Sequence, residues 1–342
     1  MKFGLQISMQ HPTSDSGIRR FKDHLEQVRL ARDTGFDSVW ASQHYLSTPF
    51  QYFQPVPTLA RVSAEAGEMT LGTGIILLAL HNPVEIAEEI ATLDMICEGR
   101  FIFGVGLGYR DEEYRAFGVP KRQAVSRFVE ALTLIKRLWT EDDVTFQGKH
   151  FQLSDVTLTT RPSQKPRPPI WIGANSDAAV KRAAEMGDAW IINPHADFST
   201  LERQVDLYKE TLHSREKPFP SEFPIIKELY LAEDRYEAMK ECRPFLEAKY
   251  QVYVAWGQDK VMPEDDALDK PFEQLQQGRF MIGDPKLCIE QIEQYRQRLG
   301  VTHMIFRAQW PGMEQAKVLR TIRLFGEKVL PRFKICEKHG EI

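Results

Sequence analysis

The alternation of short apolar stretches with longer amphipathic ones is the feature of this chain that most limits its possible folds. Eight stretches have the pattern of β-strands, and most are followed by a stretch whose apolar residues recur every three or four positions. They read KFGLQIS, SVWAS, MTLGTGIILLAL, RFIFGVGLG, PIWIGA, DAWIIN, PIIKELYLA and THMIFRA. This order is typical of an α/β protein whose parallel strands are covered by helices. Eight strands in 342 residues favour a closed (β/α)8 TIM barrel, and the even composition indicates a single domain over residues 1–342.

Two insertions interrupt the alternation. After the fourth strand, residues 144–169 contain VTFQGKHFQL, which predicts a hairpin, and RPSQKPRPP, which predicts a stiff connector. Before the eighth strand, residues 257–277 are polar and charged and include two prolines. Loops of this length often close over active sites, and a tolerated surface insertion is the equally weighted alternative.

Composition argues against several classes of function. The formal net charge of −4 gives no electrostatic reason to expect nucleic acid or an anionic membrane as a partner. The longest apolar run, residues 75–80, is too short to cross a bilayer, and the first residues lack the pattern of a signal peptide. The four cysteines lack zinc-ligand spacing, so reduced thiols in a cytoplasmic protein are expected. No G-x-G-x-x-G follows the first strand, which argues against a Rossmann fold.

The active site of a (β/α)8 barrel lies where its strands end. The second strand runs into SVWASQHYLS, where His44 is a packed residue, a metal ligand or a catalytic group. A packed core position is disfavoured because His44 lies beyond the apolar run of the strand. A role as a metal ligand is disfavoured because the histidines of the chain come singly from separate strands. Covalent catalysis lacks both a G-x-S-x-G motif and a cysteine at a strand end. Other polar residues at these ends are Ser8, Gln10, His11, Ser42, Gln43, Tyr45, His81, Tyr109, Arg110, Asn175, Ser176, Asn193, His195, Glu228, Tyr230, Arg307 and Gln309.

Two further patterns indicate ligand sites. IWIGANSDAA predicts a strand, a turn of small residues at Ala174, Asn175 and Ser176, and the start of a helix. Unpaired backbone N–H groups and the helix dipole would make this turn an anion site, and a plain helix cap at Ser176 is the alternative. GTGII and GVGLG place glycines in neighbouring strands, where they either leave room for a flat ligand or ease packing of the barrel.

Together these blocks resemble the bacterial luciferase-like family of flavin-dependent monooxygenases and oxidoreductases. The similarity extends over essentially the whole chain and is carried by MKFGL, GFDSVWASQH, LGTGIILLALHNPVEIAEEIATLDMICEGRFIFGVGLGYRDEEYRAFG, PPIWIGANS, IGDPKLCIEQI and RLFGEKVLPRF. The resemblance implies a (β/α)8 barrel with the flavin ring at its C-terminal mouth. It also implies a non-proline cis peptide bond at Gly74–Ile75 against the ring, the flavin phosphate at the turn of residues 174–176, and a catalytic histidine at His44.

The chain departs from luciferase at two positions. The phosphate-contacting arginine of luciferase aligns with Leu107, and Arg110 is near enough in sequence to replace it. The reactive cysteine of luciferase aligns with Gly106, so long-chain aldehyde oxidation with light emission is not expected. The implied cofactor-binding residues are Gly74, Ile75, Gly106, Tyr109, Arg110, Ala174, Asn175, Ser176 and Asn193, and no metal is expected.

The leading expectation is a two-component monooxygenase. Reduced FMN from a separate flavin reductase would react with O2 and oxygenate a small organic substrate, with His44 as general acid/base. A deazaflavin-dependent hydride-transfer oxidoreductase is the first alternative, and a non-catalytic subunit that supports a partner is the second. Relatives commonly dimerise through helices after the early strands, so a homodimer is expected through residues 55–66 and 83–97. Small residues there would permit close approach, and packing against the barrel explains them equally well: Ala60, Ala64, Ala87 and Ala91.

Overall fold

The computed structural model describes residues 1–263 and 266–334. Eight parallel strands form a closed barrel: β1 (Lys2–Gln6), β3 (Ser38–Ala41), β5 (Thr70–Thr73), β7 (Phe101–Gly106), β10 (Ile170–Ala174), β11 (Ala189–Ile192), β12 (Pro224–Leu231) and β14 (His303–Arg307). Pairing runs from β10 through β11, β12, β14, β1, β3 and β5 to β7, and β7 pairs with β10 again. The (β/α)8 barrel predicted from the alternation is therefore confirmed.

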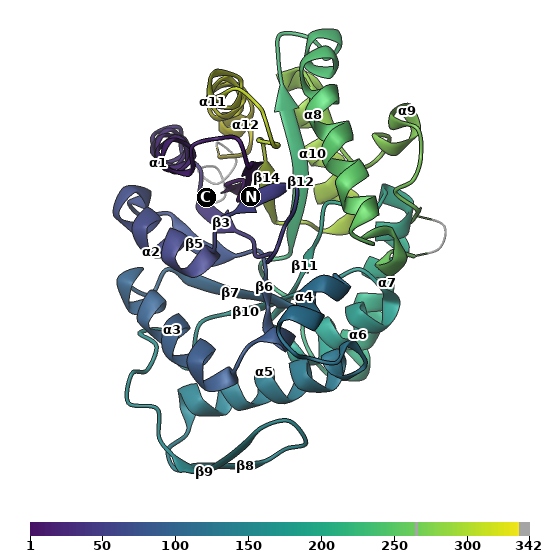
Figure 1. The fold of residues 1–342 in the computed structure, drawn as a ribbon. Helices are drawn as coiled ribbons and strands as arrows, with labels where there is room; N and C mark the ends of the chain where they lie inside the picture. The colour runs from purple at the N-terminus through teal and green to yellow at the C-terminus, as the bar shows by residue number, and fades with distance from the viewer. Residues whose placement is uncertain (264–265, 335–342) are drawn as a thin grey trace, which may run out of the picture.

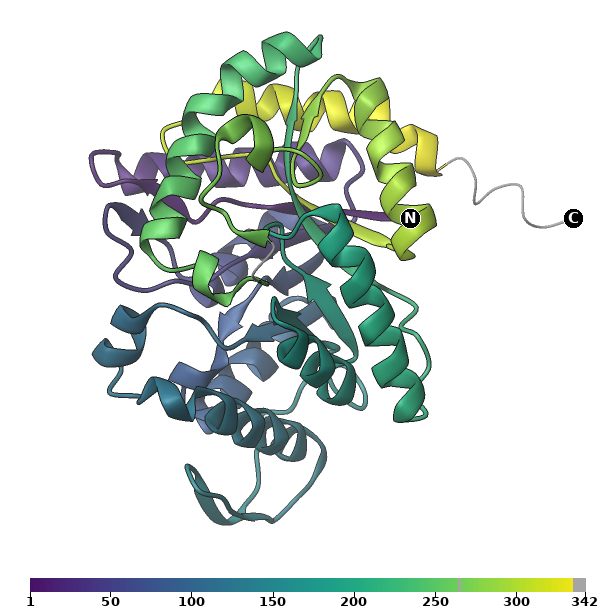
Figure 2. The same cartoon turned by 90° about the vertical axis from the view of Figure 1, so that its right-hand side faces the viewer.

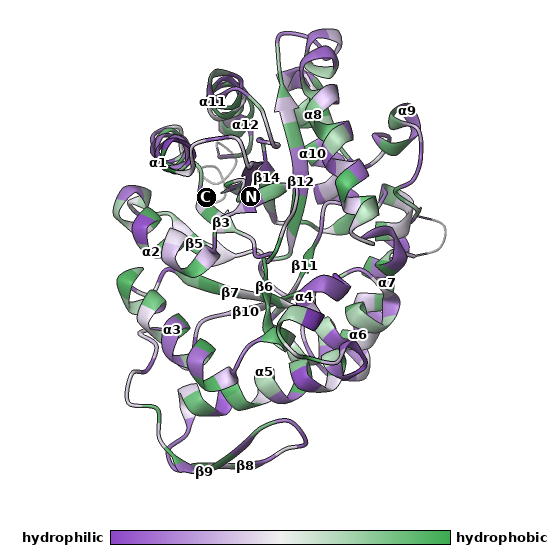
Figure 3. Cartoon of the chain, viewed as in Figure 1, coloured by the Kyte–Doolittle hydropathy of each residue, from purple (hydrophilic) through white to green (hydrophobic). Residues whose placement is uncertain are grey.

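A ring of helices surrounds the barrel (Figure 1). Its members are α1 (Gly17–Asp33), α2 (Pro55–Ala66), α3 (Pro83–Ile96), α5 (Ala124–Thr140), α6 (Asp177–Met186), α7 (Phe198–Ser214), α8 (Arg235–Ala255), α10 (Pro285–Gln294) and α11 (Gln315–Leu324). Figure 3 shows mainly hydrophobic strands inside helices that carry both hydrophobic and hydrophilic residues, as amphipathic helices do. A π-helical turn (Phe325–Val329) and α12 (Leu330–Lys334) extend α11.

Two stacked tryptophans fill the interior of the barrel. The rings of Trp40 and Trp171 have centroids 5.0 Å apart and an interplanar angle of 16°. A Cβ on Gly72 would lie 2.3 Å from the Trp40 ring, so this glycine makes room for the stack. The packing interpretation of the GTGII glycines therefore holds for Gly72, and the tryptophans close the barrel below the ends of its strands.

The third strand is interrupted where a single long strand was expected. It is divided into β5 and β6 (Ile76–Leu77), followed by a 3-10 turn (Leu78–Leu80). The Gly74–Ile75 peptide bond between them is cis, as the family resemblance implied. The Thr73 hydroxyl donates to the Gly104 carbonyl at 2.8 Å, and Gln6 Nε2 donates to the Gly74 carbonyl at 2.9 Å. These side chains replace the ladder hydrogen bonds that the interruption removes.

The first insertion forms the predicted hairpin. Its strands are β8 (Val144–Gln147) and β9 (Gln152–Val156), which pair antiparallel. Figures 1 and 2 both place this hairpin outside α5, away from the barrel. Glu130 on α5 anchors its tip by accepting the backbone N–H groups of Lys149 and His150 at 3.0 and 2.8 Å.

The second insertion contains more regular structure than predicted. A 3-10 turn (Asp259–Val261) and α9 (Phe272–Leu275) are followed by a short strand, β13 (Met281–Gly283), and α10. The first five residues of β12, Pro224–Glu228, pair with β14, and its last three, Leu229–Leu231, pair with β13. The alternation did not reveal β13 because three residues are too few to show a strand pattern.

Candidate active site

The C-terminal ends of the strands enclose a cavity of about 370 Å³. Nine of the ten residues that sequence reasoning assigned to the site line this cavity: His44, Gly74, Ile75, Gly106, Tyr109, Ala174, Asn175, Ser176 and Asn193. They come from the ends of five different barrel strands or the turns that follow them. Arg110 is the tenth residue, and it does not line the cavity.

His44 lies in the loop after β3 and forms a pair with a buried carboxylate. Its Nδ1 lies 2.9 Å from Oε1 of Glu113, whose side chain is fully buried on α4 (Asp111–Ala116). The backbone N–H of Tyr45 donates to the same oxygen at 2.9 Å. When Nδ1–H donates to Glu113, the neutral ring carries its lone pair on Nε2. The pair therefore fixes the orientation and the tautomer of an imidazole that lines the cavity.

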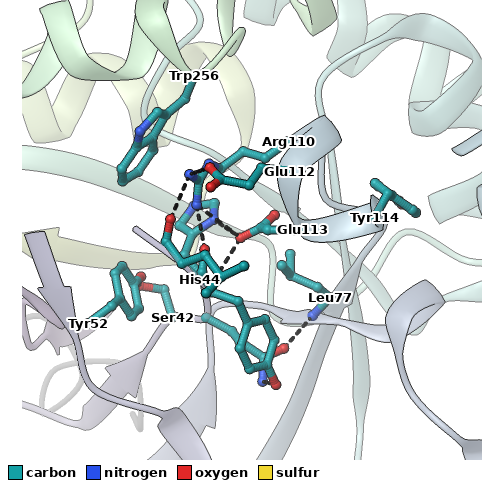
Figure 4. Close-up of polar contacts among 12 residues, drawn as sticks. Ser42, His44, Tyr52, Leu77, Arg110, Glu112, Glu113, Tyr114 and Trp256 are labelled. Atoms are coloured by element: carbon teal, nitrogen blue, oxygen red, sulfur yellow. Dashed lines mark hydrogen bonds and ion pairs between the residues drawn. The ribbon is translucent and has the colours of Figure 1, made fainter. Parts of the chain in front are cut away.

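Aromatic side chains surround this imidazole. The ring centroids of Tyr52, Tyr109 and Trp256 lie 5.5 to 5.7 Å from that of His44. Figure 4 shows His44 with Glu113 and Tyr52 on different sides and Trp256 close to Arg110. The Tyr109 hydroxyl has no hydrogen-bond partner among the described residues, and burial raises its pKa well above the ordinary value. It is therefore a neutral hydrogen-bonding group without a protein partner.

The structure places Arg110 outside the lining of the cavity. Its guanidinium donates to the backbone carbonyls of Tyr45 and Leu46 and pairs with Glu112 at 2.9 Å. It also lies 4.1 Å above the ring of Trp256. These contacts hold the loop that carries His44, so Arg110 is not in position to contact a phosphate in the cavity. A different arginine, Arg182 on α6, does line the cavity.

The turn at residues 174–176 precedes α6 as predicted. Ser176 occupies the N-cap position, but its hydroxyl makes no capping hydrogen bond. The first backbone N–H groups of a helix have no partner within the helix, and this N-terminus borders the cavity. Asn193 Nδ2 donates to the Ala174 carbonyl at 3.1 Å, and Gln204 Nε2 donates to the Asn175 carbonyl at 2.7 Å. The turn is thus held rigidly with its hydroxyl and N–H groups available to an anion.

The cavity floor combines the interrupted third strand with β7. A Cβ on Gly106 would lie 2.3 Å from Cδ1 of Ile75, so the absence of a side chain lets Ile75 occupy its position. Gln43 supports the same region, since its Oε1 accepts the backbone N–H of Leu77 at 2.9 Å and lies 3.0 Å from Nε2 of His81. The result is a floor of backbone and aliphatic surface, which suits a flat ring.

Sequence reasoning missed several residues of the site. Glu113 stands in a run of three acidic residues after the fourth strand, and that run was the available signal. Arg307 was recognised as a strand-end residue but given no role, and it lines the cavity together with Tyr253 from α8. Gln258 and Val261, from the second insertion, also line it. This insertion therefore forms part of the wall, while its action as a lid remains a prediction.

No three histidine, cysteine, aspartate or glutamate side chains in residues 1–263 and 266–334 are grouped so as to hold a metal ion. No helix in the same residues combines the length and the apolar character needed to cross a membrane.

Sequence comparison relates this architecture to known proteins. Residues 1–303 match the sequence model of the luciferase-like monooxygenases. An F420-dependent glucose-6-phosphate dehydrogenase of Kineococcus radiotolerans is 31% identical over 313 residues, which cover 84% of this chain and 87% of that protein. A protein of the same name from Amycolatopsis mediterranei is 27% identical over 328 residues, covering 92% and 95%.

Solved structures show the same fold over nearly the whole chain. The monooxygenase RslO1 of Streptomyces bottropensis has a TM-score of 0.86 and 26% identity, covering 97% of this chain and all of that one. An F420-dependent secondary alcohol dehydrogenase, solved with an F420–acetone adduct, has a TM-score of 0.79 and 22% identity, covering 96% and 98%. The oxygenating constituent of the Pseudomonas putida 3,6-diketocamphane monooxygenase, solved with FMN, has a TM-score of 0.80 and 17% identity, covering 97% and 98%.

Proposed function

The chain belongs to the luciferase-like monooxygenase family and is a flavin-type oxidoreductase, and from this premise we propose that it transfers hydride between a deazaflavin of the F420 type and a small alcohol or carbonyl compound. Relatives at 31% and 27% identity are named for F420-dependent dehydrogenation, and each matches more than four fifths of this chain. These relatives favour the deazaflavin alternative over the FMN monooxygenase that was the leading expectation.

The His44–Glu113 pair is the observation that carries this proposal. Oxidation of an alcohol to a carbonyl breaks a C–H bond, whose two electrons leave with the hydride, and also releases the hydroxyl proton. His44 Nε2 takes up that proton in the oxidising direction and returns it to the carbonyl oxygen in the reducing direction. Glu113 holds the ring through Nδ1 and provides a buried countercharge when the imidazole is protonated.

The cavity fits a cofactor of this shape. Gly74, Ile75 and Gly106 would form the floor beneath the ring, and the backbone N–H groups of residues 177 and 178 with the Ser176 hydroxyl would hold a phosphate. Arg182 adds a positive charge to the same wall. When bound, the deazaflavin supplies the hydride-accepting carbon. The surrounding aromatic side chains Tyr52, Tyr109 and Trp256 exclude water from the reacting groups.

A second candidate keeps the original expectation. The similarity to RslO1, a monooxygenase with 26% identity and a TM-score of 0.86, favours an oxygenation reaction. Reduced FMN, O2 and a separate flavin reductase are the components expected for that reaction. In that reaction His44 would serve as general acid/base beside the ring. The two candidates differ in cofactor and in the need for oxygen, so one set of experiments separates them.

Cofactor titration is the deciding experiment. Purified protein is titrated anaerobically with F420 and with FMN, each oxidised and reduced, and binding is followed by fluorescence. The F420-loaded protein is then mixed with secondary alcohols, and reduction is followed by the loss of visible absorbance of the cofactor. Binding of F420 with oxygen-independent reduction is expected. Tight binding of FMN alone, with oxygen consumption in the presence of a flavin reductase, would instead establish the monooxygenase.

We also propose a homodimer formed through α2 and α3. A surface groove between these helices is lined by four apolar residues, Val56, Ala60, Leu93 and Ile96, and by Glu88, Glu89 and Thr92. Met95 beside it is 46% exposed. Ala87 and Ala91 are fully buried against the barrel, so barrel packing accounts for them and they are not part of this surface.

A further inference from the structure

The charged side chains that line the cavity are unevenly distributed. Among the described residues, the lining includes Arg182 and Arg307 and contains no aspartate, glutamate or lysine. Arg182 lies on α6, one turn beyond the start of that helix, and Arg307 ends β14. The cofactor phosphate proposed above is assigned to the α6 end. Arg307 is therefore a second positive group for which the cofactor phosphate does not account.

Arg307 is held with part of its hydrogen-bonding capacity unused. Its Nε and Nη2 donate to Oε1 of Gln6 at 3.2 and 2.9 Å, and its Nη1 donates to Oε1 of Glu228 at 3.3 Å. The guanidinium also donates a hydrogen bond to the Tyr253 hydroxyl, so four of its five N–H donors are used and one is left. The remaining donor can form a charge-assisted hydrogen bond to one oxygen of a carboxylate or a phosphate. Tyr253, whose hydroxyl lies beside the guanidinium, lines the cavity as well.

His195 lines the cavity close to Arg307 and Tyr253. It is only 7% exposed, its Nδ1 has no hydrogen-bond partner among the described residues, and its ring centroid lies 5.6 Å from that of Tyr253. Burial, followed by the charges of Lys249 and Arg307, lowers its pKa well below the ordinary value. The imidazole is therefore neutral and offers a hydrogen bond without adding charge.

The charged residues behind this wall are mostly basic, although burial lowers the pKa values of Lys249 and Lys227 to about 7. The buried carboxylate of Glu228 is shared by Arg307 and the fully buried Lys249. Arg279 also lies close enough to act on the charge state of His195, and it pairs with Asp266. Lys227 is fully buried as well, and its Nζ has no hydrogen-bond partner within the described residues and lies 4.8 Å over the ring of Tyr295. A wall of this kind favours an anionic ligand and disfavours a cationic one.

We infer that Arg307, His195 and Tyr253 form a subsite for an anionic group of the substrate. The substrate class is then a small organic acid, an alcohol or ketone that also carries a carboxylate or a phosphate. The inference rests on the proposed function, because it takes the α6 end of the cavity as the place of the cofactor phosphate. Arg307 binds one oxygen of the anionic group through its remaining N–H group, while His195 and Tyr253 bind another oxygen or the neighbouring substrate atoms.

Matched pairs of probes test the subsite in the unmodified protein. 3-Hydroxybutyrate is compared with its methyl ester, and glucose 6-phosphate with glucose, by calorimetric titration of protein loaded with F420 or with FMN. A charge-assisted hydrogen bond is worth about 1.5–3 kcal/mol, so the anionic member of at least one pair is expected to bind roughly tenfold to hundredfold more tightly. The carboxylate pair and the phosphate pair show which oxyanion is preferred. Equal binding of both members of both pairs overturns the inference.

Two substitutions at opposite ends of the cavity show which arginine causes the preference for the anionic probe. In Arg307→Gln the preference for the anionic probe is expected to fall to less than about threefold, with cofactor affinity kept. Arg182→Gln makes the same change at the α6 end and is expected to weaken the cofactor while the probe preference persists. If Arg307→Gln weakens the cofactor and leaves the probe preference intact, Arg307 serves the cofactor and the inference is wrong.

Failure of the proposed function and failure of the anion subsite give different results in these experiments. Binding of FMN in place of F420 overturns the hydride-transfer proposal, yet the probe titrations still decide the role of Arg307. Thermal unfolding of each variant checks the fold, since Glu228 keeps Lys249 and Trp310 as partners in Arg307→Gln. If that variant does not fold, His195→Leu is used, which removes a hydrogen bond at the same subsite and is expected to lower the preference by about tenfold.

Discussion

Nδ1 of His44 and Oε1 of Glu113 lie 2.9 Å apart although 69 positions separate the two residues in sequence. Glu113 is fully buried and its Oε1 also accepts the N–H of Tyr45, so the carboxylate cannot turn away without losing two bonds. This contact joins the loop after the second barrel strand to the helix after the fourth. It makes the position of His44 depend on both.

The first prediction concerns this pair. His44→Ala is expected to lower kcat by about 10²–10⁴-fold, since it removes the proton acceptor. Glu113→Gln leaves the ring in place without a fixed tautomer or a countercharge, and a smaller loss with a shifted pH–rate profile is expected. Steady-state kinetics over a range of pH measures both. His150→Ala, on the hairpin outside α5, is the matched control, and full activity of His44→Ala would remove His44 from the mechanism.

The phosphate turn yields a second prediction. Ser176→Asp places a carboxylate where the cofactor phosphate is proposed to bind, while aspartate remains a good N-cap residue, so thermal stability is expected to hold. The affinity for FMN or F420 is expected to fall at least about tenfold through charge repulsion. Riboflavin, which lacks the phosphate, is expected to bind equally to both proteins. Ser16→Asp at the N-cap of α1 is the control, and an unchanged phosphate preference in Ser176→Asp would move the anion site elsewhere.

Two glycines are predicted to respond differently to the same substitution. A Cβ at residue 72 would lie 2.3 Å from the rigid Trp40 ring, so Gly72→Ala is expected to destabilise the protein by about 1–3 kcal/mol. At residue 106 the crowded atom is the terminal Cδ1 of Ile75, which is displaced toward the cavity. Gly106→Ala is therefore expected to weaken cofactor binding with a smaller loss of stability. Chemical denaturation measures the stability of both variants and cofactor titration measures their affinity. The prediction is wrong if Gly106→Ala loses more stability and Gly72→Ala loses more cofactor affinity.

Acid sensitivity is predicted from a buried histidine pair. His11 and His24 have their Nε2 atoms 2.9 Å apart, and burial lowers their pKa values to about 4 and about 3. Because both values lie below those of the unfolded chain, the unfolded state binds more protons at mildly acidic pH. The contribution of the two neutral histidines to the free energy of unfolding is fully present above about pH 6.5. It is lost as the pH falls toward 4, at about 1.4 kcal/mol per pH unit for each histidine.

Denaturant unfolding at several pH values measures this slope. His24→Gln is expected to flatten it, because one of the two groups no longer titrates. His213→Gln, at an exposed position on α7, is the control and is expected to leave the slope unchanged. If the free energy of unfolding of His24→Gln falls with decreasing pH as steeply as that of the unmodified protein, the histidine pair does not determine the acid sensitivity.

The final prediction concerns the α2–α3 surface. Ile96→Asp places a charge in the groove beside Met95 and is expected to convert a dimer into monomers. Light scattering after size-exclusion chromatography measures the mass. Ile18→Asp, at a 76% exposed position on α1, makes the same change elsewhere and is the control. A monomeric unmodified protein would contradict the proposed dimer.

Sequence reasoning succeeded where the signal is periodic. The eight barrel strands, the hairpin after β7 and the turn before α6 follow from local pattern, because burial on a repeating face determines each of them. The position of Gly74–Ile75 came from family resemblance and not from any pattern in the residues.

The contacts across the cavity were not predictable in the same way. Arg110 was chosen because it is near Leu107 in sequence, yet its guanidinium is directed to the carbonyls of Tyr45 and Leu46. Glu113 was overlooked because its partner lies in a loop whose path depends on the whole barrel. Neither side-chain direction is contained in strand or helix periodicity, so each had to be observed.

The division of β12 between two partners separates the closed sheet from the second insertion. The pairing of β12 with β14 closes the barrel, and its pairing with β13 fixes the end of the second insertion to the same strand. Residues between α8 and β13 can therefore lengthen or shorten without disturbing the closed sheet. Since Gln258 and Val261 of that segment line the cavity, a change of length or sequence there would reshape one wall of the cavity and leave the strand ends on its other sides in place.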